Sequence, residues 1–190
     1  RGAYDEAERL AQDLGGVAAA EIRGLVAYAR GDFAAGIARV NDALSLGAPR
    51  EARARLFGVR GMLHHASGNA AAALESFRVA AEDAQAGGVV EEATYLTGLA
   101  AAASDAGQFA VALAAATRSA LLFEELRRPS HAARAWLARA SVLGLVGAAH
   151  EACAAADEVI ERADARGDSE ALAYARLVHA EARPAGDAAG

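Results

Sequence analysis

The sequence has no lysine, and among its 190 residues it has only one cysteine, three prolines and one tryptophan. A single cysteine excludes an internal disulfide and is typical of a reducing compartment, so we expect a cytoplasmic protein. Charged residues interrupt every apolar run before about 18 residues, which excludes a membrane-spanning helix. The formal net charge is −6. Because this leaves no basic surplus for a phosphate backbone, we expect no direct contact with nucleic acid.

Alanine is abundant instead, with 57 of the 190 residues, and all 19 basic residues are arginine. Alanine has the highest intrinsic helix propensity, and no stretch alternates apolar and polar residues for long enough to form a strand. The composition therefore predicts an all-α protein. The preference for alanine, glycine and arginine also indicates a bacterial genome of high GC content.

A glycine turn recurs along the chain. It begins at Gly31-Asp32-Phe33 and returns at Gly68, Gly107, Gly147 and Gly186, with spacings of 37, 39, 40 and 39 residues. In each turn, a glycine ends one helix, one or two turn residues follow, and another helix begins. A period in this range with two helices per period is typical of an α-solenoid.

Apolar periodicity and turn residues predict ten helices. Asp32, Asn69 and Asp168 are expected as helix N-caps, and Pro49 is expected at the first position of a helix. The predicted ranges are 3–14, 17–29, 32–46, 50–66, 69–86, 89–106, 108–126, 130–146, 148–165 and 169–182.

Small residues hold two fixed places relative to the turn glycines. Two helices approach closely only where side chains are small, so these residues should be buried at helix crossings. Seven residues before the glycine they are Gly24, Gly61, Ala100 and Ala140, and five after it they are Gly36, Ala73, Ala112 and Ala152. Aromatic or large residues accompany them at Tyr4, Phe33, Phe57, Leu96, Phe109 and Trp136.

With this pattern the chain resembles the tetratricopeptide repeat (TPR) over essentially its whole length. The resemblance implies a right-handed α-solenoid of antiparallel helix hairpins with about ten helices, and a non-catalytic role in protein–protein interaction. HEAT and armadillo repeats are the alternatives at this period, but the short Gly-Asp-Phe turn favours the TPR. The expected single array consists of 1–16 (second helix of a truncated repeat), repeats at 17–48, 49–88, 89–128 and 129–167, and 168–190 (first helix of a truncated repeat).

The period exceeds the usual TPR length, and the consensus proline is mostly absent. Long-period repeats of this kind look like the sensor regions of bacterial regulators of the MalT/LuxR type and of multidomain signalling proteins. The resemblance therefore implies a fragment of a bacterial regulator or scaffold that binds a partner peptide or domain in a concave groove. The alternative is a ligand-sensing segment of a transcription regulator or kinase.

We interpret the chemically reactive side chains as structural. His64 and His65 point about 100° apart on a helix and lack further ligands, so we expect neither a metal site nor a cofactor. Cys153 occupies the place of an apolar residue in the other repeats and reads as a small core residue. Trp136 is expected in the core. Charged pairs such as Glu91-Glu92 and Arg127-Arg128 are expected to be solvated.

In TPR arrays the groove is lined by first-helix positions 13, 10, 6 and 3 residues before the turn glycine. Arginine pairs bidentately with carboxylates, so the four arginines in this set suit an acidic peptide, unless they pair with neighbouring Glu and Asp. The set comprises Glu21, Leu25, Tyr28, Arg55, Met62, His65, Thr94, Thr97, Ser104, Arg134, Leu137, Ser141, Arg176 and Arg183.

Both ends of the sequence carry apolar stripes without a polar capping helix. They comprise Tyr4, Leu10 and Leu14 at one end and Leu172, Leu177 and Val178 at the other. Exposed apolar stripes tend to be covered by another chain. We therefore expect this segment to self-associate through its ends, head-to-tail or as a two-fold homodimer, in place of repeats that belong to a longer array. The alternative is a monomer whose terminal helices fray.

Overall fold

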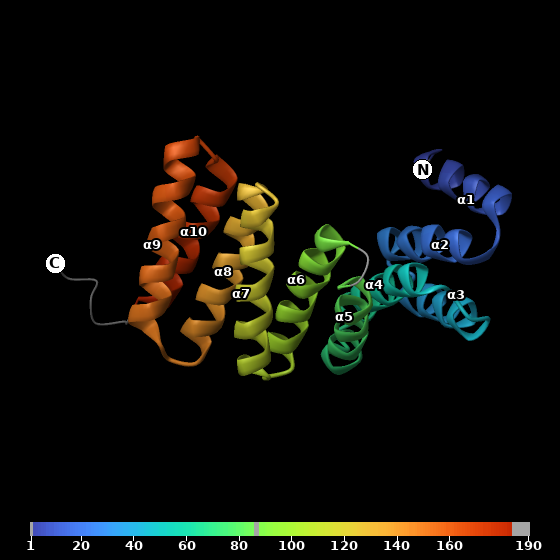
Figure 1. The fold of residues 1–190 in the computed structure, drawn as a ribbon, viewed down its shortest axis with the longest axis horizontal. Coiled ribbons are helices and arrows are strands. Elements are labelled where there is room, and N and C mark those ends of the chain that lie inside the picture. Colours follow the sequence, from blue (N-terminus) through green and yellow to red (C-terminus); the bar gives the residue numbers. More distant parts are fainter. Residues whose placement is uncertain (1, 86–87, 184–190) are drawn as a thin grey trace. The chain divides into compact units, whose positions relative to one another are not determined.

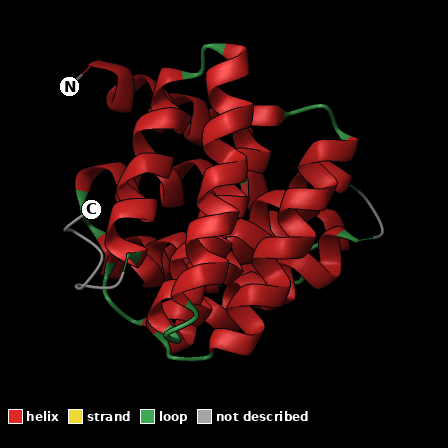
Figure 2. Cartoon of the chain, turned by 90° about the vertical axis from the view of Figure 1, so that its left-hand side faces the viewer, coloured by secondary structure: helices red, strands yellow, loops and turns green. Residues whose placement is uncertain are grey.

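The fold is all-α, as predicted. The computed structural model describes residues 2–85 and 88–183, which contain ten α-helices and no β-strand (Figure 2). All ten predicted ranges are confirmed to within two residues at either end. No described helix is long and apolar enough to cross a membrane. The helices are α1 (Gly2–Leu14), α2 (Gly16–Arg30), α3 (Phe33–Ser45), α4 (Arg50–Ala66), α5 (Ala70–Ala84), α6 (Val89–Asp105), α7 (Phe109–Glu125), α8 (Pro129–Leu145), α9 (Ala149–Arg166) and α10 (Ser169–Ala182).

The chain divides into two compact units, one up to Ala102 and the other from Ala103, so the boundary falls within α6. In the first unit each helix from α1 to α5 packs against the next, and α2 also packs against α4 (Figure 1). Contacts between the first helices of successive hairpins are what stacked hairpins produce. Their core consists of Ala20, Val40, Ala43, Leu56, Val59 and Leu63.

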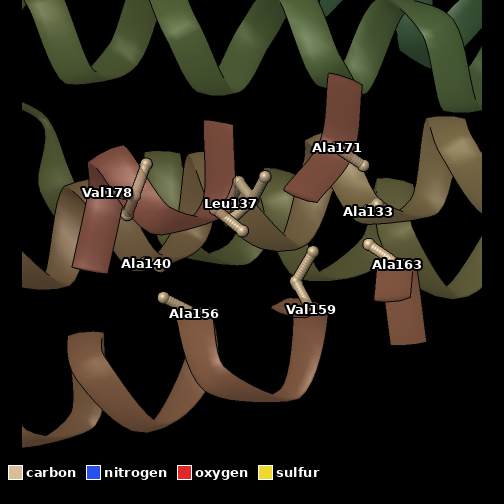
Figure 3. Close-up of a cluster of buried hydrophobic side chains, with 9 residues drawn as sticks. Ala133, Leu137, Ala140, Ala156, Val159, Ala163, Ala171 and Val178 are labelled. Atoms are coloured by element: carbon tan, nitrogen blue, oxygen red, sulfur yellow. The ribbon is translucent and has the colours of Figure 1, made fainter. Parts of the chain in front are cut away.

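The second unit repeats this scheme. Helices α7 to α10 pack in sequence, and α8 also packs against α10. Figure 3 shows the core, where Leu137 of α8 meets Val159 of α9 and Val178 of α10. Both units thus have the TPR-like architecture of an α-solenoid, while the proposed repeat boundaries stay predictions. Val178 was expected on an exposed stripe, and that expectation is wrong because only 2% of it is exposed.

The turn glycines end their helices as predicted, and they do so in the left-handed conformation. Gly31, Gly68, Gly107 and Gly147 have φ between 70° and 81°. The residue after each glycine donates its backbone N–H to the carbonyl five residues earlier, for example Asn69 to His64 at 2.9 Å. This bond closes a Schellman motif and ends the first helix of the hairpin. Gly186 lies outside the described residues.

The predicted caps are confirmed in part. Asn69 and Asp168 accept hydrogen bonds from the backbone N–H three residues later. Asp32 occupies the N-cap position of α3, but its side chain makes no capping hydrogen bond. Pro49 is itself the N-cap of α4, one position earlier than predicted.

The small residues lie at close helix contacts, which confirms the predicted register. All eight are buried. The crossing of α4, α5 and α6 is typical, because the Phe77 ring lies against Gly61 on one helix and Gly98 on another. A Cβ atom added to Gly61 would lie 2.8 Å from this ring, and one added to Gly98 would lie 2.6 Å from it. Larger side chains at these positions would therefore displace Phe77.

Candidate functional site

The predicted groove residues of the first unit are partly or fully exposed, and none of them belongs to the core. Tyr28 has 40% of its surface exposed, and its ring lies 6.2 Å from the ring of Phe33. Leu25 is 41% exposed. The eight candidates of this unit lie on three helices, with Glu21, Leu25 and Tyr28 on α2, Arg55, Met62 and His65 on α4, and Thr94 and Thr97 on α6.

Arg55 is neutralised within this surface. Its Nε donates a hydrogen bond to Glu21 Oε2 at 2.9 Å, and this bond raises the pKa of Arg55 above its ordinary value. Beside the pair, burial and the charges of Glu21 and Glu91 raise the pKa of Tyr95 to about 12. Of the two alternatives for Arg55, binding of an acidic peptide or pairing with a neighbouring carboxylate, the structure therefore shows the second.

The threonines of α6 use their hydroxyl protons within their own helix. Thr94 Oγ1 donates to the carbonyl of Val90 at 2.8 Å, and Thr97 Oγ1 donates to that of Ala93 at 3.1 Å. Serine and threonine side chains often bond to the preceding turn in this way. Both hydroxyl protons are thus engaged within α6.

Two of the predicted groove arginines in the second unit differ from Arg55. Arg134 on α8 and Arg176 on α10 are exposed, and neither forms an ion pair within the described part of the chain. Ser141 lies two turns after Arg134 on the same face of α8. Ser104 is half-buried near the end of α6, and Arg183 is exposed at the C-cap of α10.

Leu137 does not belong to this surface, so its inclusion in the groove is wrong. It has 0% exposure and lies in the core between α8, α9 and α10 (Figure 3). The TPR groove positions place Leu137 on the exposed side of α8. In the structure it lies on the buried face of this helix, which extends from Ala133 through Leu137 to Ala140.

His64 lies on α4 of the first unit, and Cys153 lies on α9 of the second. His64 is half-buried, and its pKa is lowered by burial and by the neighbouring charge of Arg60. Cys153 is half-buried on α9, with its Sγ 3.9 Å from the carbonyl oxygen of His179. Within the described ranges, no group of three or more His, Cys, Asp or Glu residues is arranged to hold a metal ion.

No protein-family model matches the chain, and no curated protein does. A solved structure, the TPR2AB-domain:pHSP90 complex of yeast Sti1, is similar to it. The TM-score is 0.42 and the sequence identity 15%, over 95% of this chain and 90% of that chain. The fold assignment rests on this chain's own helices, turns and contacts.

Sequence reasoning missed a cavity in the second unit. It has a volume of ≈180 Å³ and lies where the end of α7, the start of α8 and the end of α9 meet. Trp136 was expected in the core. Its side chain is partly buried against the core and also lines this cavity. In the sequence, the Arg127-Arg128 pair pointed to this cavity, but its other two arginines, Arg162 and Arg166, lie more than thirty residues later in the chain. Glu92 was expected in solvent and is 6% exposed, so that expectation is wrong.

Proposed function

We propose that the chain is a protein-interaction module that binds an acidic segment of a partner protein. The observation that carries the proposal is the pair of exposed arginines without ion pairs, Arg134 on α8 and Arg176 on α10, two helices of the second unit that pack against each other. We place the binding surface around these two arginines, together with Ser104, Ser141 and Arg183.

The packing beneath this surface supports the proposal. Helices α8 and α10 are in direct contact and share a core with α9. Binding residues are held most accurately when they stand on helices that the core fixes. Arg134 directly follows Ala133, and Arg176 directly follows Ala175, and both alanines belong to that core. The two guanidinium groups are thus carried by a rigid base.

The chemistry of arginine supports an acidic partner. A guanidinium group has a planar fork of donors that matches a carboxylate bidentately, and it stays charged at all physiological pH values. Arg134 and Arg176 form no ion pair within the described residues, although the chain as a whole carries a net charge of −6. In the first unit, by contrast, Glu21 offsets Arg55. We therefore expect the acidic segment to bind the second unit.

The biological setting is also part of the proposal. The long repeat period resembles regulators of the MalT/LuxR type, and the arginine-only, alanine-rich composition favours a bacterial source. We propose that the module belongs to a cytoplasmic signalling or transcription-regulating protein in which it acts as a scaffold and catalyses no reaction.

Binding of labelled peptides tests the proposal. Fluorescence anisotropy would compare a peptide of alternating Glu and Ala with the matching Arg–Ala peptide. We expect only the acidic peptide to bind, and we expect the affinity to fall as salt is added. Arg134→Gln combined with Arg176→Gln should weaken binding at least about tenfold, because each lost charge-assisted contact lowers the binding free energy.

The matched control is Arg118→Gln, which removes a positive charge from an exposed position on α7. It should leave the affinity unchanged. Equal binding of the acidic and basic peptides, or equal losses for the control and the double variant, would contradict the proposal.

A further inference from the structure

The cavity of the second unit is strongly cationic. Four arginines and one glutamate line it, which gives its wall a formal charge of +3 in a chain whose net charge is −6. None of its lining residues belongs to the proposed peptide surface. They are Glu124, Arg127, Arg128, Pro129, Ala132, Ala133, Trp136, Val159, Arg162 and Arg166.

One side of the cavity is held in place by hydrogen bonds. Trp136 Nε1–H donates to Glu124 Oε1 at 2.9 Å, and Arg162 Nη1 donates to the same oxygen at 3.0 Å. Arg162 also forms an ion pair with Glu158 at 3.5 Å. Glu124 therefore fixes the indole and joins α7 to α9, and the charge of Arg162 is already compensated.

The remaining three arginines supply the positive charge. Arg127, Arg128 and Arg166 are exposed and form no ion pair within the described residues. Asp168 lies near enough to Arg166 for the arginine to lower the pKa of this carboxyl group, but the carboxylate accepts hydrogen bonds from Ser130 and from the backbone of Ala171. The first turn of α8 adds the partial positive charge of a helix N-terminus to the same wall.

The cavity also has an apolar part. Ala132, Ala133 and Val159 line it beside Trp136, and all three are buried. A second hollow of ≈240 Å³ lies beyond the indole and shares Trp136, Val159 and Arg162 with the first. Arg139 and Arg162 are balanced in this second hollow by Glu151 and Glu158, so its wall carries no net formal charge.

We propose that this cavity binds a small molecule in which a phosphate monoester is attached to a flat apolar group. The phosphate accepts hydrogen bonds from Arg127, Arg128 and Arg166, since guanidinium groups match phosphate oxygens in a fork geometry. The apolar group lies against Trp136. A volume of ≈180 Å³ equals that of about six water molecules, which limits the ligand to a single small ring or a chain of similar size.

A phosphate dianion fits better than a monocarboxylate. Three guanidinium groups without ion pairs surround the site, and a single carboxylate would leave most of their donors without an acceptor. Cations are excluded by the same charge. The site goes beyond the proposed peptide-binding function and would give the module a second, small-molecule ligand.

The single tryptophan of the chain is a built-in probe, since all indole fluorescence comes from this cavity. Titration with phenyl phosphate should change the Trp136 emission saturably, with a dissociation constant of about 1 mM or lower. Calorimetry with the same compound gives the affinity independently. Benzoate and phenol, which lack the phosphate, should bind at least about tenfold more weakly.

Variants locate the site. Arg128→Gln combined with Arg166→Gln should weaken phenyl phosphate at least about tenfold, and the single variants provide the same test should the double variant lose its helical circular dichroism. Arg118→Gln and the peptide-surface variant Arg134→Gln/Arg176→Gln should bind phenyl phosphate as the wild type does. The two proposals therefore fail independently.

Several results would overturn the inference. One is the absence of saturable binding up to about 10 mM phenyl phosphate. Another is that benzoate or phenol binds as tightly as phenyl phosphate. Full affinity in the Arg128/Arg166 variants, or loss of affinity in the Arg134/Arg176 variant, would also show that the cavity is not the site.

Discussion

Asp83 shows how a nearly buried carboxylate joins two helices of the first unit. Its side chain is 6% exposed near the end of α5, and Arg53 of α4 donates to both carboxylate oxygens, at 2.6 and 2.7 Å. Arg50 adds an ion pair at 3.5 Å. Arg53 and then Arg50 hold the pKa of Asp83 below its ordinary value of 3.8. The carboxylate thus stabilises the fold in its charged form.

Asp83→Asn should lower the free energy of unfolding at neutral pH by about 2 kcal/mol, because it removes charge-assisted hydrogen bonds to Arg53. Urea denaturation measures the loss. The matched control is Glu82→Gln, since Glu82 is an exposed neighbour paired with Arg78, and it should change stability by less than about 0.5 kcal/mol. Equal effects of the two substitutions would refute this role for Asp83.

The same carboxylate predicts a pH dependence. A depressed pKa in the folded state stabilises the protein above the unfolded-state pKa, and the stabilisation is lost as the pH falls through the folded-state value. The stability difference between wild type and Asp83→Asn should therefore be largest at neutral pH and should shrink below the ordinary value of 3.8. Urea titrations of both proteins at several pH values check this, and a difference independent of pH would contradict it.

Arg127 has a backbone conformation that favours glycine, with φ at 53°. It occupies the place in the turn between α7 and α8 that Gly167 occupies between α9 and α10. Arg127→Gly should raise the free energy of unfolding by up to about 1 kcal/mol, because glycine adopts this conformation without strain. The neighbouring change Arg128→Gly, at φ −109°, should not stabilise. Chemical denaturation would settle it, and a destabilised Arg127→Gly would count against the argument.

At the level of single residues, the sequence predicted what local chemistry decides. Gly31 and its equivalents were predictable because left-handed backbone favours glycine, and Asn69 was predictable as a cap because its side chain reaches the third amide. The left-handed backbone of Arg127 was not predictable, because an arginine side chain does not favour this conformation. The Arg55–Glu21 pair joins residues 34 positions apart, and the repeat register alone could not choose between pairing and a free guanidinium.

At the scale of helices, the small-residue register decides which helices can cross. Ala112 on α7 has 0% exposure, whereas Ala114 on the same helix is exposed. Ala112→Leu should overpack the crossing and destabilise the protein by roughly 1–3 kcal/mol. Ala114→Leu should be close to neutral. Thermal unfolding of both variants tests the register, which would be wrong if the melting temperature of Ala112→Leu equalled that of the wild type.

The cavity beside Trp136 also belongs to the scale of helices, and this is why the sequence did not predict it. Its walls come from α7, α8 and α9, over residues 124–166. The repeat register assigns each of these helices a buried face, but it does not say where the ends of three helices leave a gap. Sequence therefore identified the elements and their core faces, whereas the cavity depends on side-chain packing at a junction.

At the scale of the whole molecule, exposed apolar side chains on α1 predict self-association. Tyr4, Leu10 and Leu14 are 39%, 54% and 60% exposed. We expect a concentration-dependent dimer by size exclusion with light scattering, because burial of these side chains removes apolar surface from water. Leu10→Glu combined with Leu14→Glu should give a monomer. A wild-type protein that stays monomeric at high micromolar concentration would rule out the dimer.

The central claim is that Arg134 and Arg176 select an acidic partner, and charge reversal tests it most directly. In the same anisotropy measurement, the variant Arg134→Glu/Arg176→Glu should no longer bind the Glu–Ala peptide and should bind the Arg–Ala peptide instead. The reason is that complementary charge decides the choice of partner. Arg118→Glu, with a change of the same sign on α7, should keep the wild-type preference. Retention of the acidic peptide by the double variant, with no gain for the basic one, would contradict the account.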